Sequence, residues 1–369
     1  MSLLPPEKWM RRALELGEKG RFSTSPNPMV GAVLARAGKQ IAEGYHEKYG
    51  GPHAETIALK KAGPRARGGS LYVTLEPCAT WGKTPPCVAA ILESGVREVF
   101  IAAVDPNPKN SGKGILALTK AGIKVRKGIL SSEVQLQNEA FFKYARTGLP
   151  FVTLKMAQSL DGKIAARSGL SRWISSGVSR DFVHRLRAEQ DAILVGTQTL
   201  LEDDPFLSPR FNPSGLIQKG KPWRIVLDRR LKISPAARVF RGEQITGIAI
   251  SEKIFKNLPA KTKKFKNSCI LLPIPERQGK LDLRSLLKRL GGLGVAKLLV
   301  EGGGETAWSF LEAGLVDRFF WIVAPKFLGG SQAKTSVEGR GVARPSQAIR
   351  PKRLTCEPLG EDWLFEGRF

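Results

Sequence analysis

Gly51-Pro52-His53-Ala54-Glu55, followed by Pro77-Cys78 and Pro86-Cys87, is the part of the sequence that decides the first fold. One histidine and two cysteines form a donor set that zinc prefers, and three protein ligands leave the fourth tetrahedral position open to water. Two thiolates and a neutral imidazole also balance the charge of the metal. We therefore predict a zinc site on His53, Cys78 and Cys87.

Glu55 stands two residues after His53, in the first turn of a helix that we predict to begin near residue 53 and to end at Ala62. A carboxylate there reaches the open position of the metal without binding the metal itself. Zinc lowers the pKa of water and supplies hydroxide near neutral pH, while a carboxylate passes protons to a ring nitrogen and to a leaving amine. The pattern is typical of zinc-dependent base deaminases, with a longer spacing between the cysteines. Glu55 is the predicted general acid and base.

Other interpretations of this site stay open. A closed structural zinc site needs a fourth ligand, which His46 could supply, but an acid beside a ligand has no structural use there. A non-catalytic zinc scaffold is a second alternative. The net charge of +26, spread over both halves of the chain, attracts anions generally. A nucleic-acid base deaminase with an accessory domain is therefore a third, although the 8% of aromatic residues show no basic–aromatic clustering for stacking bases.

The alternation of apolar runs predicts two layered α/β domains. In the first we expect helices at 7–19, 53–62, 87–94 and 115–120 and strands at 30–34, 71–75, 98–104 and 123–126. In the second we expect strands at 151–156, 192–196, 223–228, 245–250, 297–301 and 318–325, helices at 178–189, 282–290 and 306–313, and a β segment at 361–369. Arg146 to Pro150 is the predicted seam, so the domains are 1–147 and 148–369.

The cysteines and the termini bear on the compartment. Pro5, Pro6 and Glu7 interrupt any apolar targeting segment, and the apolar run at 319–323 is too short to cross a bilayer. Four cysteines without a signal peptide indicate reduced thiols and a cytoplasmic protein. Cys269 and Cys356 are expected to be inert, partly buried thiols.

Over nearly its whole length the chain resembles the bifunctional deaminase-reductases of riboflavin biosynthesis. The first half carries SPNPMVGAV at 25–33, GYHEKYGGPHAE at 44–55, VTLEPCATWGKTPPC at 73–87 and DPNP at 105–108. The second half carries LKMAQSLDGKIA at 154–165, SRWIS at 171–175, ILVGTQTLLEDDP at 193–205, LVEGGG at 299–304 and APKFLGG at 324–330. The resemblance implies a cytidine-deaminase-like three-layer domain followed by a dihydrofolate-reductase-like domain.

The resemblance also implies two reactions and their cofactors. Zinc serves the deamination of 2,5-diamino-6-(phosphoribosylamino)pyrimidin-4-one, and NADPH then reduces the ribosyl side chain to a ribityl one. The expected partner is a small phosphorylated aminopyrimidine, not a nucleic acid or a membrane, and the family leads us to expect a homo-oligomer. Its first substrate pocket would be lined by Asn27, His46, Lys83, Asp105 and Asn107. The family commonly has His at the positions of Thr80 and Ile57, so these departures bear on the rate of the first step.

In the second half the resemblance assigns three groups of residues. The cofactor-binding positions are Ala157, Trp173, Ser175, Thr199, Asp203, Gly303, Gly304, Glu305 and Thr306. The substrate-binding positions are Ser171, Arg187, Leu207, Arg210 and Glu301. Lys155 and Asp203 are the candidates that polarise and protonate the oxygen of the reduced ribose carbon. The alternatives are plain core packing for Trp173, a solvated surface position for Arg187, a turn role for Asp203 and a ligand-free glycine turn at 302–304.

Overall fold

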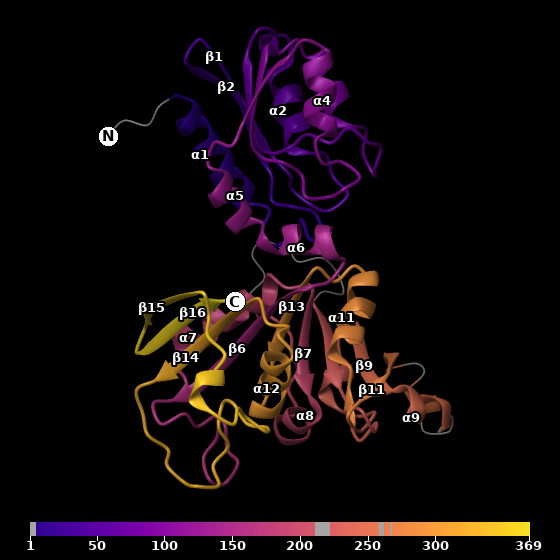
Figure 1. Ribbon diagram of the computed structural model, residues 1–369, viewed down its shortest axis with the longest axis vertical. Helices are drawn as coiled ribbons and strands as arrows, with labels where there is room; N and C mark the ends of the chain where they lie inside the picture. The colour runs from indigo at the N-terminus through magenta and orange to yellow at the C-terminus, as the bar shows by residue number, and fades with distance from the viewer. Residues whose placement is uncertain (1–4, 211–221, 258–261, 266–267) are drawn as a thin grey trace. The chain divides into compact units, whose positions relative to one another are not determined.

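The computed structural model describes residues 5–210, 222–257, 262–265 and 268–369 (Figure 1). Contacts divide the chain into two compact units, Met1–Gly148 and Leu149–Phe369. Each unit has a mixed α/β architecture with its own sheet and its own buried core. No helix in the described ranges combines the length and the apolar character that a membrane crossing needs.

The first unit is built on a five-stranded sheet. Its strands are β1 (Gly31–Arg36), β2 (Lys39–Tyr45), β3 (Ser70–Leu75), β4 (Glu98–Ala103) and β5 (Lys124–Lys127). They lie in the order β2-β1-β3-β4-β5, with β1 antiparallel to both of its neighbours and β3, β4 and β5 parallel. The parallel strands bring their carboxyl ends to one edge, where Cys78 follows β3.

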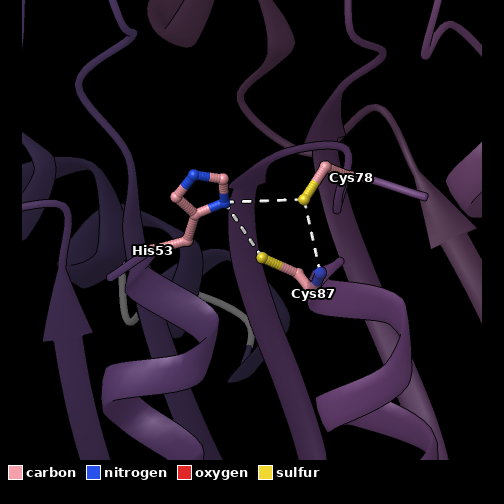
Figure 2. A group of neighbouring side chains, drawn as sticks. All are labelled: His53, Cys78 and Cys87. Atoms are coloured by element: carbon pink, nitrogen blue, oxygen red, sulfur yellow. Dashed lines mark hydrogen bonds between the residues drawn. The ribbon is translucent and has the colours of Figure 1, made fainter. Parts of the chain in front are cut away.

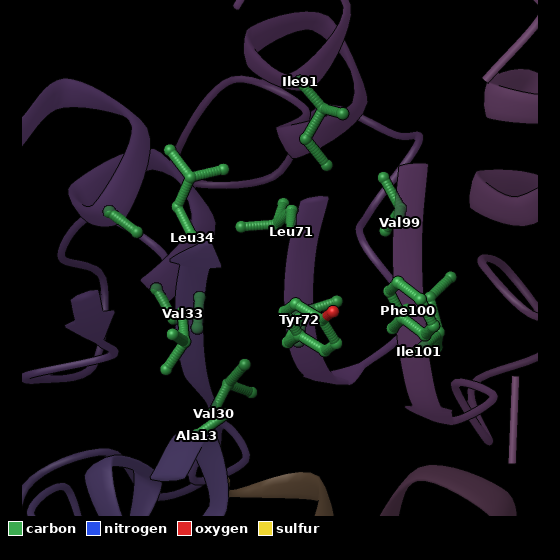
Figure 3. Close-up of a cluster of buried hydrophobic side chains, with 14 of the residues drawn as sticks. Ala13, Val30, Val33, Leu34, Leu71, Tyr72, Ile91, Val99, Phe100 and Ile101 are labelled. Atoms are coloured by element: carbon green, nitrogen blue, oxygen red, sulfur yellow. The ribbon is translucent and has the colours of Figure 1, made fainter. Parts of the chain in front are cut away.

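Helices cover both faces of this sheet. They are α1 (Pro5–Glu18), α2 (Ala54–Ala62), α3 (Cys87–Glu93), α4 (Lys113–Lys120), α5 (Ser131–Gln137) and α6 (Glu139–Thr147), with a 3-10 turn η1 (Gly63–Ala66) after α2. Helix α2 packs on β1 and β2 and contacts α3, whereas α1 and α5 contact the sheet through β1, β3 and β4. Figure 3 shows the core between these layers, where Val33, Leu71 and Ile101 are completely buried.

The sequence prediction omitted three elements of this unit. Strand β2 is polar and mostly at the edge, so its alternation is weak; it is entered through Ala37 and Gly38, both with positive φ. Helices α5 and α6 are short and meet at Asn138, which breaks the apolar period between them. The buried Asn138 side chain hydrogen-bonds both the N–H and the carbonyl of Met29, at 2.8 and 3.0 Å. It thereby ties this helical end to the segment that enters β1.

The second unit contains a nine-stranded sheet in the order β10-β9-β8-β7-β13-β6-β14-β16-β15. Its strands are β6 (Phe151–Ser159), β7 (Ala192–Gly196), β8 (Trp223–Leu227), β9 (Thr246–Ser251), β10 (Ile270–Ile274), β13 (Lys297–Glu301), β14 (Arg318–Ala324), β15 (Arg353–Leu359) and β16 (Asp362–Arg368). The strands from β10 to β14 are parallel, and β16 and β15 run antiparallel at the far edge.

Alternate residues of the central strands feed two cores on opposite faces of the sheet. In β7, Ala192 and Leu194 pack with α11 (Leu283–Gly292) and α12 (Gly304–Glu312), whereas Ile193 and Val195 pack with α7 (Gly177–Ala188). Successive side chains of a strand point to opposite faces, and a sheet buried on both faces therefore reads as one continuous apolar run.

Further elements of the second unit are short. They are α8 (Thr197–Asp203), α9 (Glu252–Asn257), the 3-10 turns η3 (Arg238–Phe240) and η4 (Pro345–Gln347), and the two-stranded pair β11 (Glu276–Arg277) and β12 (Lys280–Leu281). Strand β15 was not predicted, because it is an exposed, polar edge strand without alternation. It carries Cys356, which is exposed, so the expectation of a partly buried thiol is wrong there. Cys269 is partly buried, and burial raises the pKa of its thiol to about 12.

Candidate active sites

The three predicted zinc ligands lie together at the carboxyl edge of the first sheet. His53 is the residue before α2, Cys78 follows β3, and Cys87 is the first residue of α3 (Figure 2). Nδ1 of His53 lies 3.1 Å from Sγ of Cys87 and 3.5 Å from Sγ of Cys78. The three ligand atoms all lie within 4.8 Å of one another. A nitrogen and two sulfurs at this spacing fit a tetrahedral zinc ion that keeps one open position.

The contact between Cys78 and Cys87 shifts the pKa values of the two thiols in opposite directions. The Cys87 side chain bonds to Cys78 Sγ and the Cys87 backbone N–H donates to it at 3.3 Å, and these bonds lower the pKa of Cys78 to about 4. The same thiol contact, together with burial, raises the pKa of Cys87. Cys78 lies in the loop between β3 and α3, so its thiolate is favoured by these direct hydrogen bonds and not by a helix N-terminus.

Glu55 is buried in the first turn of α2, with 3% of its surface exposed. Burial raises the pKa of this carboxyl group, and the neighbouring His53 opposes the rise. The carboxyl group interacts with Cys87, and Glu55 is not a member of the ligand cluster. An uncoordinated acid beside a metal cluster can hold or release a proton at the reacting position.

The loop that carries Cys78 is fixed by two buried residues that the sequence analysis did not single out. The carboxylate of Glu76 accepts hydrogen bonds from the backbone N–H groups of Asp105, Gly112 and Ile115, at 3.1, 2.9 and 3.1 Å. Oδ1 of Asn110 accepts the N–H of Ala79 at 2.9 Å. Glu76 could have been found from the sequence, because it stands between an apolar strand and Pro77. A carboxylate at such a position is buried and needs hydrogen-bond partners.

The predicted substrate-binding residues of the first site differ in burial and in whether their side chains are already hydrogen-bonded. His46 is buried and neutral, since burial lowers its pKa; its Nδ1 donates to the carbonyl of Pro52 at 3.0 Å, and its Nε2 accepts from Asn27 Nδ2 at 3.1 Å. Lys83 is exposed, with Nζ 4.0 Å from the ring centroid of Tyr49. His46 is thus a fixed support, and Lys83 is an accessible cation on the ligand loop.

The side chains of Asp105 and Asn107 both form hydrogen bonds within their own loop. Oδ1 of Asp105 accepts the N–H of Asn107 at 2.8 Å, and its Oδ2 accepts from Asn110 at 3.0 Å. Oδ1 of Asn107 accepts the N–H of Lys109 at 3.1 Å. These are turn-forming bonds, so the side chains of both residues already serve the local structure.

The two departures from the family occupy different surroundings. Thr80 is exposed on the loop between Cys78 and Cys87. Ile57 is half-buried on α2, where it packs closely against Gly44: a Cβ on that glycine would lie 2.9 Å from Cβ of Ile57. Neither is part of the ligand cluster.

The second unit contains a cavity of about 1830 Å³. Every residue that the resemblance assigned to the reductase lines it, except Gly304. Gly304 is buried at the start of α12, where a Cβ would lie 2.6 Å from the carbonyl oxygen of Thr335. Its role in the structure is therefore the close approach of α12 to the 335–338 segment.

One end of this cavity is formed by the strand–turn–helix at β13 and α12. Gly303 precedes α12, and its N–H donates to Oγ1 of Thr199 at 3.1 Å. Thr306 packs against Gly196, where an added Cβ would meet Oγ1 of Thr306 at 2.5 Å. N–H groups in the first turn of a helix lack intrahelical acceptors and favour anionic groups. Together these contacts suit a dinucleotide phosphate at this end.

Trp173 lies on the cavity wall with 62% of its surface exposed, so the alternative that it is core packing is wrong. The guanidinium of Arg180 lies 4.4 Å from its ring centroid, and Arg180 also donates to the carbonyl of Ser175 at 2.8 Å. Arg180 thereby holds both predicted cofactor residues on one side of the cavity. Ala157, on β6, also lines the cavity.

A charged cluster lies elsewhere on the cavity wall. Nε and Nη2 of Arg187 donate to the two carboxylate oxygens of Glu301 at 2.7 and 2.8 Å, and Nζ of Lys155 lies 3.7 Å from the same carboxylate. Burial would raise the pKa of Glu301, but Arg187 and Lys155 outweigh it and lower that pKa to about 2. Burial lowers the pKa of Lys155. Arg187 is therefore not a solvated surface residue, because two nitrogens of its guanidinium are hydrogen-bonded to Glu301.

Asp203 closes α8 and accepts a hydrogen bond from the hydroxyl of Ser171 at 3.0 Å. This contact joins two of the predicted residues across the cavity wall. Leu207 is buried with a φ of +51°, and the N–H of Arg210 donates to Nδ1 of His184 at 3.2 Å. The turn after α8 thus brings Asp203, Leu207 and Arg210 to one cavity.

Comparisons with known proteins match both units. The cytidine and deoxycytidylate deaminase zinc-binding region matches residues 5–103, and the RibD C-terminal domain matches residues 150–365. The riboflavin biosynthesis protein RibD of Aquifex aeolicus is 42% identical over 359 residues, which cover 97% of each chain. The chain belongs to the RibD family.

Solved structures of RibD proteins have the same fold. Acinetobacter baumannii RibD aligns with a TM-score of 0.88 at 34% identity, covering 99% of this chain and 98% of that one. The Thermotoga maritima protein, described as a diaminohydroxyphosphoribosylaminopyrimidine deaminase/5-amino-6-(5-phosphoribosylamino)uracil reductase, aligns with a TM-score of 0.83 at 35% identity, with the same coverage. This RibD-family chain is a bifunctional deaminase and reductase of riboflavin biosynthesis, with a zinc-binding deaminase domain and an NADPH-dependent reductase domain.

Proposed function

We propose that residues 1–147 deaminate 2,5-diamino-6-(phosphoribosylamino)pyrimidin-4-one and that residues 148–369 reduce the ribosyl side chain of the product to a ribityl one. The observation that carries the proposal is the coexistence in one chain of the His53, Cys78 and Cys87 cluster and a separate cavity lined by the reductase residues. The description of the Thermotoga maritima relative supports the same pair of substrates.

In the first reaction His53, Cys78 and Cys87 hold the metal, and their geometry fits it. When bound, zinc is a Lewis acid that lowers the pKa of water. Water adds to the aminated ring carbon, the carbon–nitrogen bond breaks, and a carbonyl and ammonia result. The Glu55 carboxylate takes a proton from the water and gives it to a ring nitrogen; it then takes the proton of the added hydroxyl group and gives it to the departing amine. Its burial keeps bulk water from competing for these protons.

The first substrate is positioned by the loops around this cluster. Asn27 presents the part of its amide that is not bonded to His46, and His46 fixes that orientation. Lys83 is the accessible cation for the substrate phosphate. Asp105 and Asn107 contribute mainly by holding the shape of their loop, because their side-chain oxygens already accept backbone or amide N–H groups.

In the second reaction NADPH supplies a hydride. Thr199, Gly303, Glu305 and Thr306 hold the phosphate end of the cofactor, while Trp173, Ser175 and Ala157 lie along its nicotinamide end, and Gly304 allows α12 to reach its place. The protein's task is to place the ribose carbon against the cofactor and to exclude other reactions.

The substrate of the second reaction is proposed to bind by the charged cluster. Lys155 holds a proton at Nζ and gives it to the oxygen that is released from the ribose carbon, with Asp203 and Ser171 orienting that oxygen. Glu301 and Arg187 orient Lys155, and the remaining N–H of Arg187 together with Arg210 faces the phosphate. Leu207 forms the apolar part of this wall.

Three further points belong to this proposal. The partner is a small phosphorylated aminopyrimidine and not a nucleic acid. The net charge of +26 attracts both small phosphorylated molecules and nucleic acids, but the cavity fits a small molecule. The compartment is the cytoplasm. The assembly is a homo-oligomer.

The test is an assay of the zinc-loaded full chain with the diaminopyrimidinone phosphate, following ammonia release and NADPH oxidation separately. We expect ammonia release without NADPH and NADPH oxidation only after deamination or with the deaminated substrate supplied. Ammonia release from single-stranded DNA or tRNA, with none from the small substrate, would overturn the proposal in favour of a nucleic-acid deaminase. Absence of both activities in folded, metal-loaded protein would support the scaffold alternative.

A further inference from the structure

Arg224 is the only lysine or arginine that is completely buried in the part of the chain that the structure describes. It belongs to β8, between Trp223 and the buried apolar residues Ile225 and Val226. Charged side chains are rarely buried, and a buried cation is costly unless its N–H groups are paired. An apolar side chain would fill this position without that cost. We therefore expect the guanidinium to have a specific structural role.

The partners of Arg224 are neutral oxygens. Its Nη1 donates to the carbonyls of Val239 and Arg241 at 2.6 and 2.7 Å, and its Nη2 donates to Oε1 of Gln244 at 2.6 Å. All three acceptors belong to the 238–244 segment. Burial alone lowers the pKa of Arg224, to about 10, so it remains a cation at neutral pH. The side chain thus gathers one loop around a positive charge.

The same group supports a second segment, residues 204–208. The ring centroid of Phe206 lies 5.2 Å from Cζ of Arg224, within the range of a cation–π contact. Oε1 of Gln244, which Arg224 holds, also accepts the hydroxyl of Ser208 at 3.1 Å. Oδ1 of Asp204 accepts the N–H of Arg238 at 2.9 Å. One of these contacts joins 204–208 to Arg224 itself, and the other two join it to the loop that Arg224 organises.

Residues 205–208 form part of the reductase cavity. Phe206, Leu207 and Ser208 line it, as does Arg210, whereas Arg224 does not. Leu207 has a left-handed backbone with φ of +51°, which is unfavourable for a residue with a branched side chain. Such a conformation persists only where the surroundings enforce it. The contacts centred on Arg224 lie on either side of this residue.

We propose that Arg224 is a positioning residue of the reductase site, which fixes the 204–208 segment so that Leu207 and Arg210 meet the phosphorylated substrate. This inference rests on the proposed function, which puts these two residues on the substrate side. Arg224 acts through Phe206 and Gln244 and touches neither substrate nor cofactor. Its loss therefore weakens substrate binding more than cofactor binding.

The test compares Arg224→Met, Arg224→Lys and Gln244→Met in the zinc-loaded full chain. For Arg224→Met we expect the KM for the deaminated substrate to rise by about tenfold or more, because small displacements of binding groups cost one to two orders of magnitude. The dissociation constant for NADPH, measured by fluorescence titration, should change less than about twofold by the same argument. Arg224→Lys keeps the charge but not the fork and should fall between. Gln244→Met should shift KM in the same direction.

Two controls separate positioning from general loss of stability. Leu287→Ala removes a completely buried side chain of α11 that does not line the cavity; it should lower the melting temperature without raising KM. Ammonia release by the first unit reports that each variant is folded and metal-loaded. Hydrogen exchange of the peptide that spans 204–210 should become faster in Arg224→Met and stay unchanged in Leu287→Ala.

The outcomes are distinguishable. Unchanged KM and unchanged exchange at 204–210 in Arg224→Met and Gln244→Met overturn the inference, as does an equal loss of substrate and NADPH binding. If Arg224→Met does not fold, Gln244→Met decides by the same readings. If the wild-type chain oxidises no NADPH with this substrate, the proposed function fails, and the exchange measurement still decides whether Arg224 fixes the segment.

Discussion

Arg187 and Glu301 are joined by two parallel hydrogen bonds, of 2.7 and 2.8 Å, on the wall of the reductase cavity. Nζ of Lys155 lies 3.7 Å from the same carboxylate. Two cations thus share one buried anion, and the cluster has a surplus positive charge beside the cavity. A surplus of this kind favours a phosphorylated ligand.

Replacing Glu301 by Gln should destabilise the second unit strongly. The change leaves two buried cations without their anion, and breaking a buried ion pair from one side costs about 3–5 kcal/mol. Chemical unfolding measures the loss, and NADPH oxidation should fall while ammonia release continues. Glu276→Gln, which removes a more exposed partner of Arg229, is the matched control and should change the free energy of unfolding much less. Equal effects of the two variants would contradict the expected role of burial.

The same carboxylate should make stability depend on acid pH. The pKa of Glu301 is about 2 in the folded chain against an ordinary 4.5, so between these values the unfolded chain binds a proton that the folded chain does not. The contribution of Glu301 is complete above about pH 4.5 and is lost as the pH falls toward about 2. We expect the difference in unfolding free energy between wild type and Glu301→Gln to shrink from pH 6 to pH 3, and a constant difference would count against this.

Lys155 should set the alkaline limit of the reductase. Burial lowers its pKa below the ordinary 10.5, and Glu301 only partly opposes this. If protonated Lys155 is the acid, kcat/KM for NADPH oxidation falls as the pH rises through that lowered pKa. Lys155→Arg keeps its charge but does not release its proton at these pH values, so it should lose about 10²- to 10⁴-fold in rate, as Lys155→Met should. Lys288→Arg, at an exposed position of α11, should leave the profile unchanged.

Glu55→Gln should separate proton transfer from metal binding. The substitution removes the proposed acid and base but no member of the ligand cluster. Ammonia release should fall by about 10²- to 10⁴-fold, with zinc content and NADPH oxidation unchanged. Glu93→Gln, at the exposed end of α3, is the control. Loss of zinc would make Glu55 a ligand, and unchanged ammonia release would support a scaffold.

How much of these sites could be predicted follows from where the information lies. His53, Glu55 and Cys87 are placed by local rules, since ligand type, spacing and a helix start can be read within a few residues. The partner of Arg187 could not be found in this way, because Glu301 lies 114 positions further along the chain and only the order of the parallel strands brings them together. The resemblance assigned both residues to one substrate side without indicating that they bind each other.

Two of the strands that sequence patterns missed share a physical cause. Strands β2 and β15 lie at sheet edges, where one face or both faces stay wet, so no alternation of apolar residues is required. Arg224 shows the opposite case, a charge in a strand that is otherwise buried. Its role depends on a loop that returns from residues 238–244, and no local pattern contains that information.

Glu76 offers a test of how far support of the zinc site extends beyond its ligands. Its carboxylate collects three backbone N–H groups from the 105–115 region and thereby fixes the turn into Cys78. In Glu76→Gln one acceptor oxygen becomes a donor that faces an N–H group, and an unsatisfied buried polar group costs about 1–3 kcal/mol. We expect a lower melting temperature of the first unit, and zinc affinity reduced by about 10- to 100-fold, as is usual when support of a ligand is lost.

The matched control for that experiment is Glu98→Gln, which changes a surface ion pair with Lys124 and Arg126 at the start of β4. It should leave zinc affinity unchanged. Zinc affinity is measured by competition with a chromogenic chelator. NADPH oxidation is the internal reference, because Glu76 and Glu98 both belong to the first unit and the reductase site belongs to the second. Glu76→Gln could lower the melting temperature and still bind zinc as tightly as the wild type. In that case the hydrogen bond between Asn110 and Ala79 alone fixes the backbone of the Cys78 turn. The contribution of Glu76 would then be confined to folding.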